Sequence, residues 1–196
     1  MFDYSSKLAQ LGYKQLEGTH GAADYNALSL IEHSQLKVPH DYQEFLSNFP
    51  LTGIFNKKVV FSGIETSPWA ANGQEVLEVL YGCCTNKSND LMKVREQYLA
   101  QVPAHFLVIG QVTGANLICL DMNPVSLGYV YLWDHEHLGD DLDGFYLVAK
   151  SFVGFVESLQ LGDDRLAEGS PRLVKMDLSD ALKARIVDMK SKQEKS

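Results

Sequence analysis

A dense group of acidic and histidine side chains follows the apolar run GYVYLW in the second half of the chain. Its members are Asp134, His135, Glu136, His137, Asp140, Asp141 and Asp143. Two histidines one residue apart, with carboxylates nearby, are ligand types that zinc binds. Alternate residues share one face only while a strand continues, however, and this segment is leaving its strand. Because no second cluster accompanies it at a suitable spacing, we predict an exposed acidic loop and no metal site.

Two adjacent cysteines, Cys83 and Cys84, are the other residues that could do chemistry. Neighbouring cysteines rarely bridge each other because the disulfide would be strained. A nucleophilic thiol needs a base and an orienting group, and nothing in the sequence places a histidine beside either residue. Cys119 lies inside an apolar run and is predicted to be a buried small hydrophobic residue. We predict reduced thiols, no catalytic residue, no cofactor and no enzymatic activity, and we leave open a redox or metal role for the pair.

Three apolar runs before the acidic group predict an antiparallel meander. They span residues 106–109, 117–120 and 129–133. Gly110 and Gly114 lie between the first two runs, and a strand follows them rather than a helix. They are therefore interpreted as turn residues, since a phosphate-binding loop would open a helix. The third run ends at Asp134, so the meander would deliver the acids to one edge of a sheet.

Helices are predicted on both sides of this meander. In the segment between Pro39 and Pro50, four apolar residues recur at i, i+3, i+4 and i+7, which places them on one helical face: Tyr42, Phe45, Leu46 and Phe49. The same spacing recurs after a capping serine, Ser151, in Phe152, Phe155, Val156 and Leu159. Residues 23–35 and 89–101 are further helix candidates. Residues 57–61 and 145–148 read as strands, and residues 75–81 fit either element.

The order of these elements predicts an α+β fold, with a central, mostly antiparallel sheet flanked by helices. The length of 196 residues suits a single domain. We divide the chain into an N-terminal lead-in (1–22), the α+β domain (23–160), and a linker with a C-terminal amphipathic helix (161–196). The terminal helix has an apolar stripe and is a candidate for pairing with a second copy of the chain.

Charge narrows the choice of partner. The formal net charge is −8, and residues 121–149 contain six acids and no lysine or arginine. Nucleic acid needs a basic patch, so direct binding to it is disfavoured, and a basic protein partner is favoured. The competing interpretation is that the acidic excess only keeps the protein in solution. No apolar run approaches the roughly 18 residues of a membrane helix, and the N-terminus lacks the pattern of a signal peptide, so a cytoplasmic location without a membrane partner is expected.

Four motifs, in order, resemble the SUKH superfamily. LKVPHDYQEFLSNFP is similar to the family's L-x-x-P-x-D-Y-x-x-F-L signature through Leu36, Pro39, Asp41, Tyr42, Phe45 and Leu46. FLVIGQVTGANLICLD resembles its glycine-bracketed hairpin, VYLWDHE its strand ending in an acidic turn, and VAKSFVGFVESL its closing helix. The resemblance covers about residues 23–160. Phe49-Pro50 departs from the Asn-Gly-Gly of many members, and the extension beyond Leu161 is not required by the core family.

The resemblance implies an α+β SUKH-like fold and a protein-binding role. The superfamily includes bacterial immunity proteins of toxin systems and fungal regulators of cell-wall synthesis. We therefore expect an immunity-type protein that binds a cognate toxin, for example a nuclease with a basic surface. The residues expected to contact it are Trp133, Asp134, Glu136, Asp140, Asp141 and Asp143. The alternative for this segment is a solvated turn with Trp133 in the core. A regulatory or scaffolding module that binds a host partner is the main alternative, and a small-ligand protein or enzyme is the third.

Overall fold

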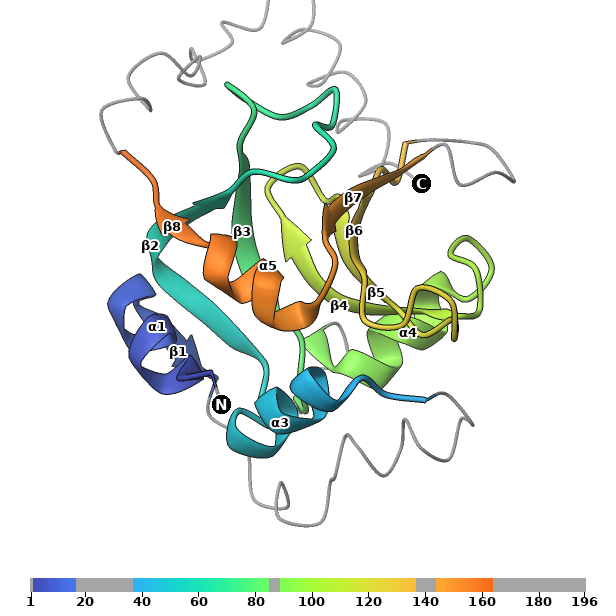
Figure 1. Ribbon diagram of the computed structural model, residues 1–196, viewed down its shortest axis with the longest axis horizontal. Helices are drawn as coiled ribbons and strands as arrows, with labels where there is room; N and C mark the ends of the chain where they lie inside the picture. Colours follow the sequence, from blue (N-terminus) through green and yellow to red (C-terminus); the bar gives the residue numbers. More distant parts are fainter. Residues whose placement is uncertain (1, 17–36, 85–88, 137–143, 164–196) are drawn as a thin grey trace, which may run out of the picture. The chain divides into compact units, whose positions relative to one another are not determined.

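The computed structural model describes residues 2–16, 37–84, 89–136 and 144–163 (Figure 1). Within these ranges the chain forms a mostly antiparallel sheet with helices packed on it, which confirms the predicted α+β class. The strands run in the order β1-β2-β3-β4-β5-β6-β7, and β8 pairs with β2. Their bounds are β1 Tyr13–Gln15, β2 Gly53–Phe61, β3 Glu75–Leu80, β4 Phe106–Val112, β5 Leu117–Asp121, β6 Val130–Trp133, β7 Phe145–Ala149 and β8 Gln160–Leu161.

The predicted meander is confirmed as β4, β5 and β6. Gly114 lies in the turn between β4 and β5, but Gly110, interpreted as a turn residue, lies within β4 opposite Ile118. Val108 of β4 lies opposite Cys119 of β5, and Leu120 of β5 lies opposite Val130 of β6. Every residue of β5 is buried, so this strand is covered on both faces. Cys119 is among them, as predicted, and burial raises the pKa of its thiol because a thiolate would lose its hydration there.

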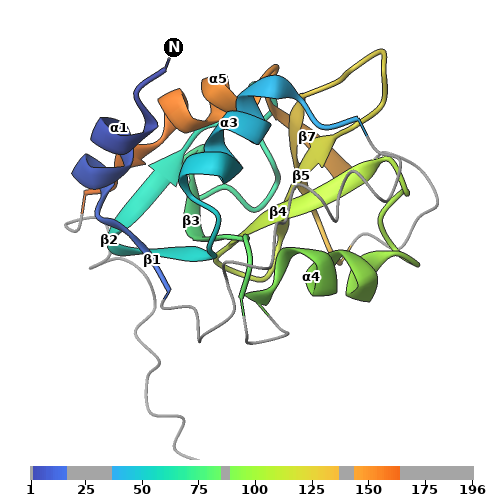
Figure 2. The ribbon, with the colours of Figure 1, turned by 90° about the horizontal axis from the view of Figure 1, so that it is seen from below.

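Four helices flank the sheet in the described part of the chain: α1 Tyr4–Leu11, α3 His40–Asn48, α4 Leu91–Tyr98 and α5 Phe152–Ser158. Figure 2 shows α1, α3 and α5 on one side of the sheet and α4 on the other. The first three share an aromatic cluster, in which the ring of Phe152 lies 4.9 Å from both Tyr42 and Phe45 between ring centroids. Burial of these large rings is the main force that fixes the helices on the sheet.

The periodicity predictions for α3 and α5 are confirmed. Tyr42, Phe45 and Leu46 are buried on one face of α3. Ser151 caps α5, since its Oγ accepts a hydrogen bond from the Gly154 N–H at 3.0 Å. The strand predicted at 57–61 is the second half of the longer β2, the ambiguous segment 75–81 forms β3, and the helix predicted at 89–101 is the shorter α4. The helices predicted at 23–35 and near the C-terminus lie outside the described residues.

The N-terminal lead-in contributes structure for which the sequence offered no prediction. Helix α1 buries Tyr4, Leu8 and Leu11, and β1 pairs with β2 so that Lys14 lies opposite Ile54. A left-handed glycine, Gly12, ends α1 and allows the sharp entry into β1. Helix α1 and strand β1 are therefore part of the fold, and Tyr4, Leu8 and Leu11 belong to its core.

The connection between β2 and β3, residues 62–74, covers the outer edge of β7. The backbone N–H groups of Ile64 and Glu65 donate to the carbonyls of Val148 and Leu147, at 3.2 and 2.8 Å. The Leu147 N–H donates in return to the Glu65 carboxylate at 2.7 Å. These bonds satisfy an exposed sheet edge. They also anchor the connection that contains Trp69 to β7.

Asp41 links two helices that are distant in the sequence. Its Oδ2 accepts a hydrogen bond from the Val153 N–H in the first turn of α5 at 3.0 Å, and its Oδ1 accepts from the Tyr42 N–H at 2.9 Å. Its backbone carbonyl accepts from the Tyr4 hydroxyl of α1 at 3.0 Å. A carboxylate beside the N-terminus of a helix is also favoured by the helix dipole.

Replacement of Asp41 by alanine is expected to lower the free energy of unfolding by roughly 1.5–3 kcal/mol, because a backbone donor of α5 loses its charged acceptor. Urea denaturation followed by circular dichroism measures this loss. Glu44→Ala on the same helix is the matched control and is expected to stay within about 0.5 kcal/mol of the wild type. Equal stabilities of the Asp41 variant and the wild type would contradict the assignment.

Candidate functional site

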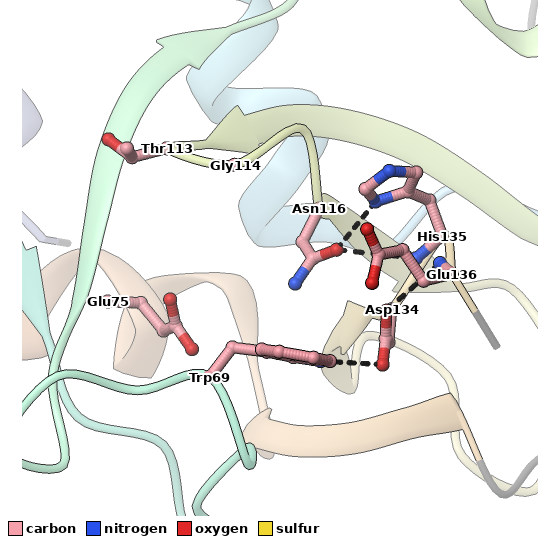
Figure 3. Close-up of a pocket in the computed structure, with 8 residues that line it drawn as sticks. All are labelled: Trp69, Glu75, Thr113, Gly114, Asn116, Asp134, His135 and Glu136. Atoms are coloured by element: carbon pink, nitrogen blue, oxygen red, sulfur yellow. Dashed lines mark hydrogen bonds between the residues drawn. The ribbon is translucent and has the colours of Figure 1, made fainter. Parts of the chain in front are cut away.

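A pocket of about 290 Å³ opens where β6 ends (Figure 3). Three segments meet there: the β2–β3 connection with the start of β3, the turn between β4 and β5, and the residues after β6. Its lining residues are Trp69, Glu75, Thr113, Gly114, Asn116, Asp134, His135 and Glu136. Side chains that are several elements apart in the sequence therefore meet at one end of the sheet.

Asp134 joins two walls of the pocket. Its Oδ2 accepts a hydrogen bond from the indole N–H of Trp69 at 2.7 Å, and its Oδ1 accepts from the Glu136 N–H at 3.0 Å. Its backbone N–H donates to the Gly144 carbonyl at 2.9 Å. The side chain is buried, with 7% of its surface exposed, so the carboxylate fixes both Trp69 and the chain after β6.

The β4–β5 turn forms a third wall. Gly114 and Ala115 have φ angles of 90° and 70°, and such left-handed conformations are unusual for an alanine. They bring Asn116 to a position where its Oδ1 accepts from the His135 N–H at 3.3 Å and lies 2.8 Å from His135 Nδ1. Nδ1 therefore donates to the amide oxygen, and Asn116 sets the orientation of the imidazole.

Glu75, the first residue of β3, is the most deeply buried carboxylate of the pocket apart from Asp134. Only 9% of its surface is exposed, and its Oε1 accepts a hydrogen bond from Ser67 Oγ at 2.5 Å. Burial raises the pKa of this carboxyl group above its usual value, because the charged form loses hydration, and the Ser67 hydrogen bond offsets part of the rise.

The electrostatic character of the lining is negative. Three of its residues carry carboxylates, one carries an imidazole, and none is a lysine or arginine. A concave site with one sign of charge concentrates the field in its opening. The pocket is therefore suited to a positively charged group rather than to a phosphate or a carboxylate.

The structure brings together two of the predicted contact residues and separates a third from them. Asp134 and Glu136 both line the pocket, and Glu136 is exposed. Trp133 was expected as a surface contact, but it is only 4% exposed and its ring packs against Tyr98 of α4 and Phe145 of β7. The prediction for its side chain is corrected: helix α4 covers this end of β6. The other predicted contacts, Asp140, Asp141 and Asp143, lie outside the described residues.

The aromatic residue that does reach the pocket is Trp69, with 57% of its surface exposed. In the sequence it lies within ETSPWAANG, and no function was predicted for it. The sequence could have indicated this role, because a tryptophan inside a polar segment rich in turn residues has few apolar neighbours to bury it. Glu75 and Asn116 gave no comparable signal, since their approach to Asp134 depends on the packing of distant elements.

The remaining candidates for chemistry contribute little to this site. Within the described ranges, no three histidine, cysteine or acidic side chains are grouped closely enough to hold a metal ion. The backbone N–H of Cys83 donates to the Pro50 carbonyl and that of Cys84 to the Asp90 carboxylate, and neither residue lines the pocket. A second pocket of about 300 Å³ lies at the N-terminus, between residues 2–5 and α3.

A search of the described helices finds none with the length and apolar character needed to cross a membrane.

Comparison with known proteins identifies a related family. The sequence model of the SMI1 / KNR4 family (SUKH-1) matches residues 28–158. The SPbeta prophage-derived uncharacterized protein YokK of Bacillus subtilis (strain 168) is similar to the chain, with 33% identity over 133 residues. The aligned part covers 63% of this chain and 67% of that protein. No solved structure gives a significant match.

Loss of the Asp134 carboxylate is expected to release Trp69. In Asp134→Ala, acrylamide should quench the fluorescence of Trp69 more strongly than in the wild type, because the indole loses the hydrogen bond that holds it against the pocket. The Trp69 signal is obtained by subtracting the spectrum of Trp69→Phe. Glu78→Ala, which removes a carboxylate bonded to Thr113 Oγ1 at the surface, serves as control. Equal quenching in Asp134→Ala and the wild type would show that the bond does not restrain Trp69.

The raised pKa of Glu75 predicts that removing its charge stabilises the fold, by an amount that depends on pH. The folded protein binds this proton more tightly than the unfolded chain does, so the ionised carboxylate destabilises the fold above the raised pKa. Glu75→Gln should therefore be more stable than the wild type at pH 7. The difference should shrink as the pH falls towards the ordinary value of 4.5. Thermal unfolding across this range measures it, and a difference that is constant or grows on acidification would contradict the assignment.

Proposed function

We propose that this chain, which belongs to the SMI1/KNR4 family (SUKH-1), is an immunity-type protein that binds and neutralises a cognate toxin. Membership of the family indicates an immunity or regulatory role. The finer assignment to a toxin, and to a basic toxin domain in particular, is the proposal. Cytoplasmic action and a binding role without catalysis, as expected from the sequence, belong to the same proposal.

The observation that carries the proposal is the acidic pocket at the end of β6. Its carboxylates come from Glu75, Asp134 and Glu136, and no lysine or arginine lines it. The exposed indole of Trp69 lies in the same pocket and offers an aromatic contact. Aromatic side chains that become buried on binding, inside a polar rim, are frequent centres of tight protein interfaces.

The mechanism we propose is steric and electrostatic. A nuclease or a similar toxin has a basic groove that binds the phosphates of its substrate. An acidic surface that docks on this groove blocks the substrate and replaces the phosphate charge. Opposite charges also steer the two proteins together before contact, which shortens the time that a toxin stays active. Asp140, Asp141 and Asp143 follow Glu136 in the sequence and are proposed to contact the same partner.

Affinity capture tests the proposal and separates it from the regulatory alternative. The tagged full-length protein is purified from its native cells, and the proteins that remain bound in near-stoichiometric amount are identified by mass spectrometry. A basic toxin domain whose activity is inhibited by the pure protein would support immunity. A larger cellular assembly with no toxin would support a regulatory or scaffolding role instead.

Charge reversal at the pocket rim is expected to slow association with the toxin. In Glu136→Lys the association rate constant should fall at least several-fold at low salt, and its dependence on ionic strength should weaken, because steering is lost. Surface plasmon resonance at several salt concentrations measures both quantities. Glu157→Lys, an exposed residue of α5 that does not line the pocket, is the matched control. Association kinetics that respond equally to both substitutions would exclude this pocket as the charged contact.

A further inference from the structure

The pocket holds a rigid aromatic surface that remains open to solvent. Trp69 is 57% exposed, yet its indole N–H is bonded to Asp134 at 2.7 Å and its backbone N–H donates to Ser67 Oγ at 3.2 Å. Figure 3 shows the indole lying between Glu75 and Asp134, with the β4–β5 turn opposite. A large ring fixed in this way loses little conformational entropy when a ligand stacks on it.

A buried carboxylate beside this ring has no positive partner among the described residues. Glu75 is 9% exposed, and Ser67 Oγ is the one donor that its carboxylate has among the described residues. No described lysine, arginine or histidine forms an ion pair with it. A carboxylate can accept about four hydrogen bonds, so the described residues leave most of its acceptor capacity without a donor. A buried charge without a counter-charge is costly, and a cation entering the pocket would offset that cost.

The size of the pocket limits the ligand to a single small group. Its volume of about 290 Å³ lies at the bottom of the roughly 300–1,000 Å³ that small-molecule and cofactor sites occupy. One long side chain fits this space better than a cofactor does. The acceptors are spread over Glu75, Asp134 and Glu136, so they suit a donor group with several N–H bonds pointing in different directions.

We propose that the pocket is a receptor for an arginine side chain presented by the protein partner. The guanidinium stacks on the indole of Trp69 and donates to the carboxylates of Glu75 and Glu136. A planar guanidinium has five donors and stacks on aromatic rings, whereas the ammonium of lysine is a compact and strongly hydrated charge. This inference rests on the proposed function for the identity of the partner, but the recognition itself is a property of the pocket.

A titration with a small probe tests this recognition without any toxin. N-acetyl-arginine amide is added to the full-length protein, and the indole N–H signals are followed by ¹H–¹⁵N NMR. Trp69→Phe assigns the Trp69 signal. We expect a saturable shift of that signal, while the signal of the buried Trp133 stays in place. The matching citrulline amide, which has the same shape without the charge, should give no saturable shift, and the lysine amide should bind at least several-fold more weakly.

Substitutions in the pocket identify the carboxylates that bind the arginine probe. Glu75→Gln keeps the shape of the side chain and is expected to weaken arginine binding about tenfold. Glu136→Gln, at an exposed position, is also expected to lower the affinity for arginine, and it provides the test if Glu75→Gln fails to fold. Glu157→Gln is the control and should bind as the wild type does. No saturable shift in the folded wild type, equal binding of citrulline or lysine, or unchanged binding in both pocket variants would overturn the proposal.

The outcomes also separate this inference from the proposed function. Arginine binding in a protein that captures no toxin would uphold the receptor and reject the immunity role. A captured toxin that is inhibited equally well by the wild type and Glu75→Gln, without binding of the arginine probe, would uphold immunity and reject the receptor.

Discussion

The candidate site depends on one hydrogen bond, from the indole N–H of Trp69 to the buried carboxylate of Asp134 at 2.7 Å. It joins the β2–β3 connection to the end of β6, which are neighbours in neither the sequence nor the strand order. Without it the indole would have no fixed position, and the pocket would lose the wall that faces the β4–β5 turn. A hydrogen bond to a charged acceptor is strong enough to restrain a loop in this way. The exposed indole and the carboxylates beside it are held together by this restraint.

The buried carboxylate of Glu75 in the pocket lowers the stability of the free protein. Glu75 is buried, its pKa is raised because hydration is lost, and no cation in the described part of the chain compensates it. An apolar residue at the start of β3 would be compatible with strand formation and would avoid this cost. An acid at this position is consistent with a group that is completed by a ligand. The same feature that weakens the isolated fold would thus supply affinity and charge selectivity in a complex.

Local patterns predicted the fold well, and tertiary contacts explain what they missed. The spacing of Tyr42, Phe45 and Leu46 indicated α3, and the apolar runs before Asp134 indicated the meander, because both patterns are periodic along the chain. The burial of Trp133 was missed because Tyr98 of α4 covers it, a contact between residues far apart in the sequence. Trp69 and Glu75 were missed for a similar reason. The connection that contains Trp69 is held by bonds between Glu65 and Leu147, which are 82 positions apart.

The most direct test is the structure of the complex between this protein and the partner that it captures from its native cells. We expect the partner to dock at the end of β6, with an arginine side chain in the pocket between Trp69 and Glu75 and with basic residues facing Glu136. A partner bound to the face formed by α1, α3 and α5, with the pocket open to solvent, would contradict the assignment of this pocket as the recognition site.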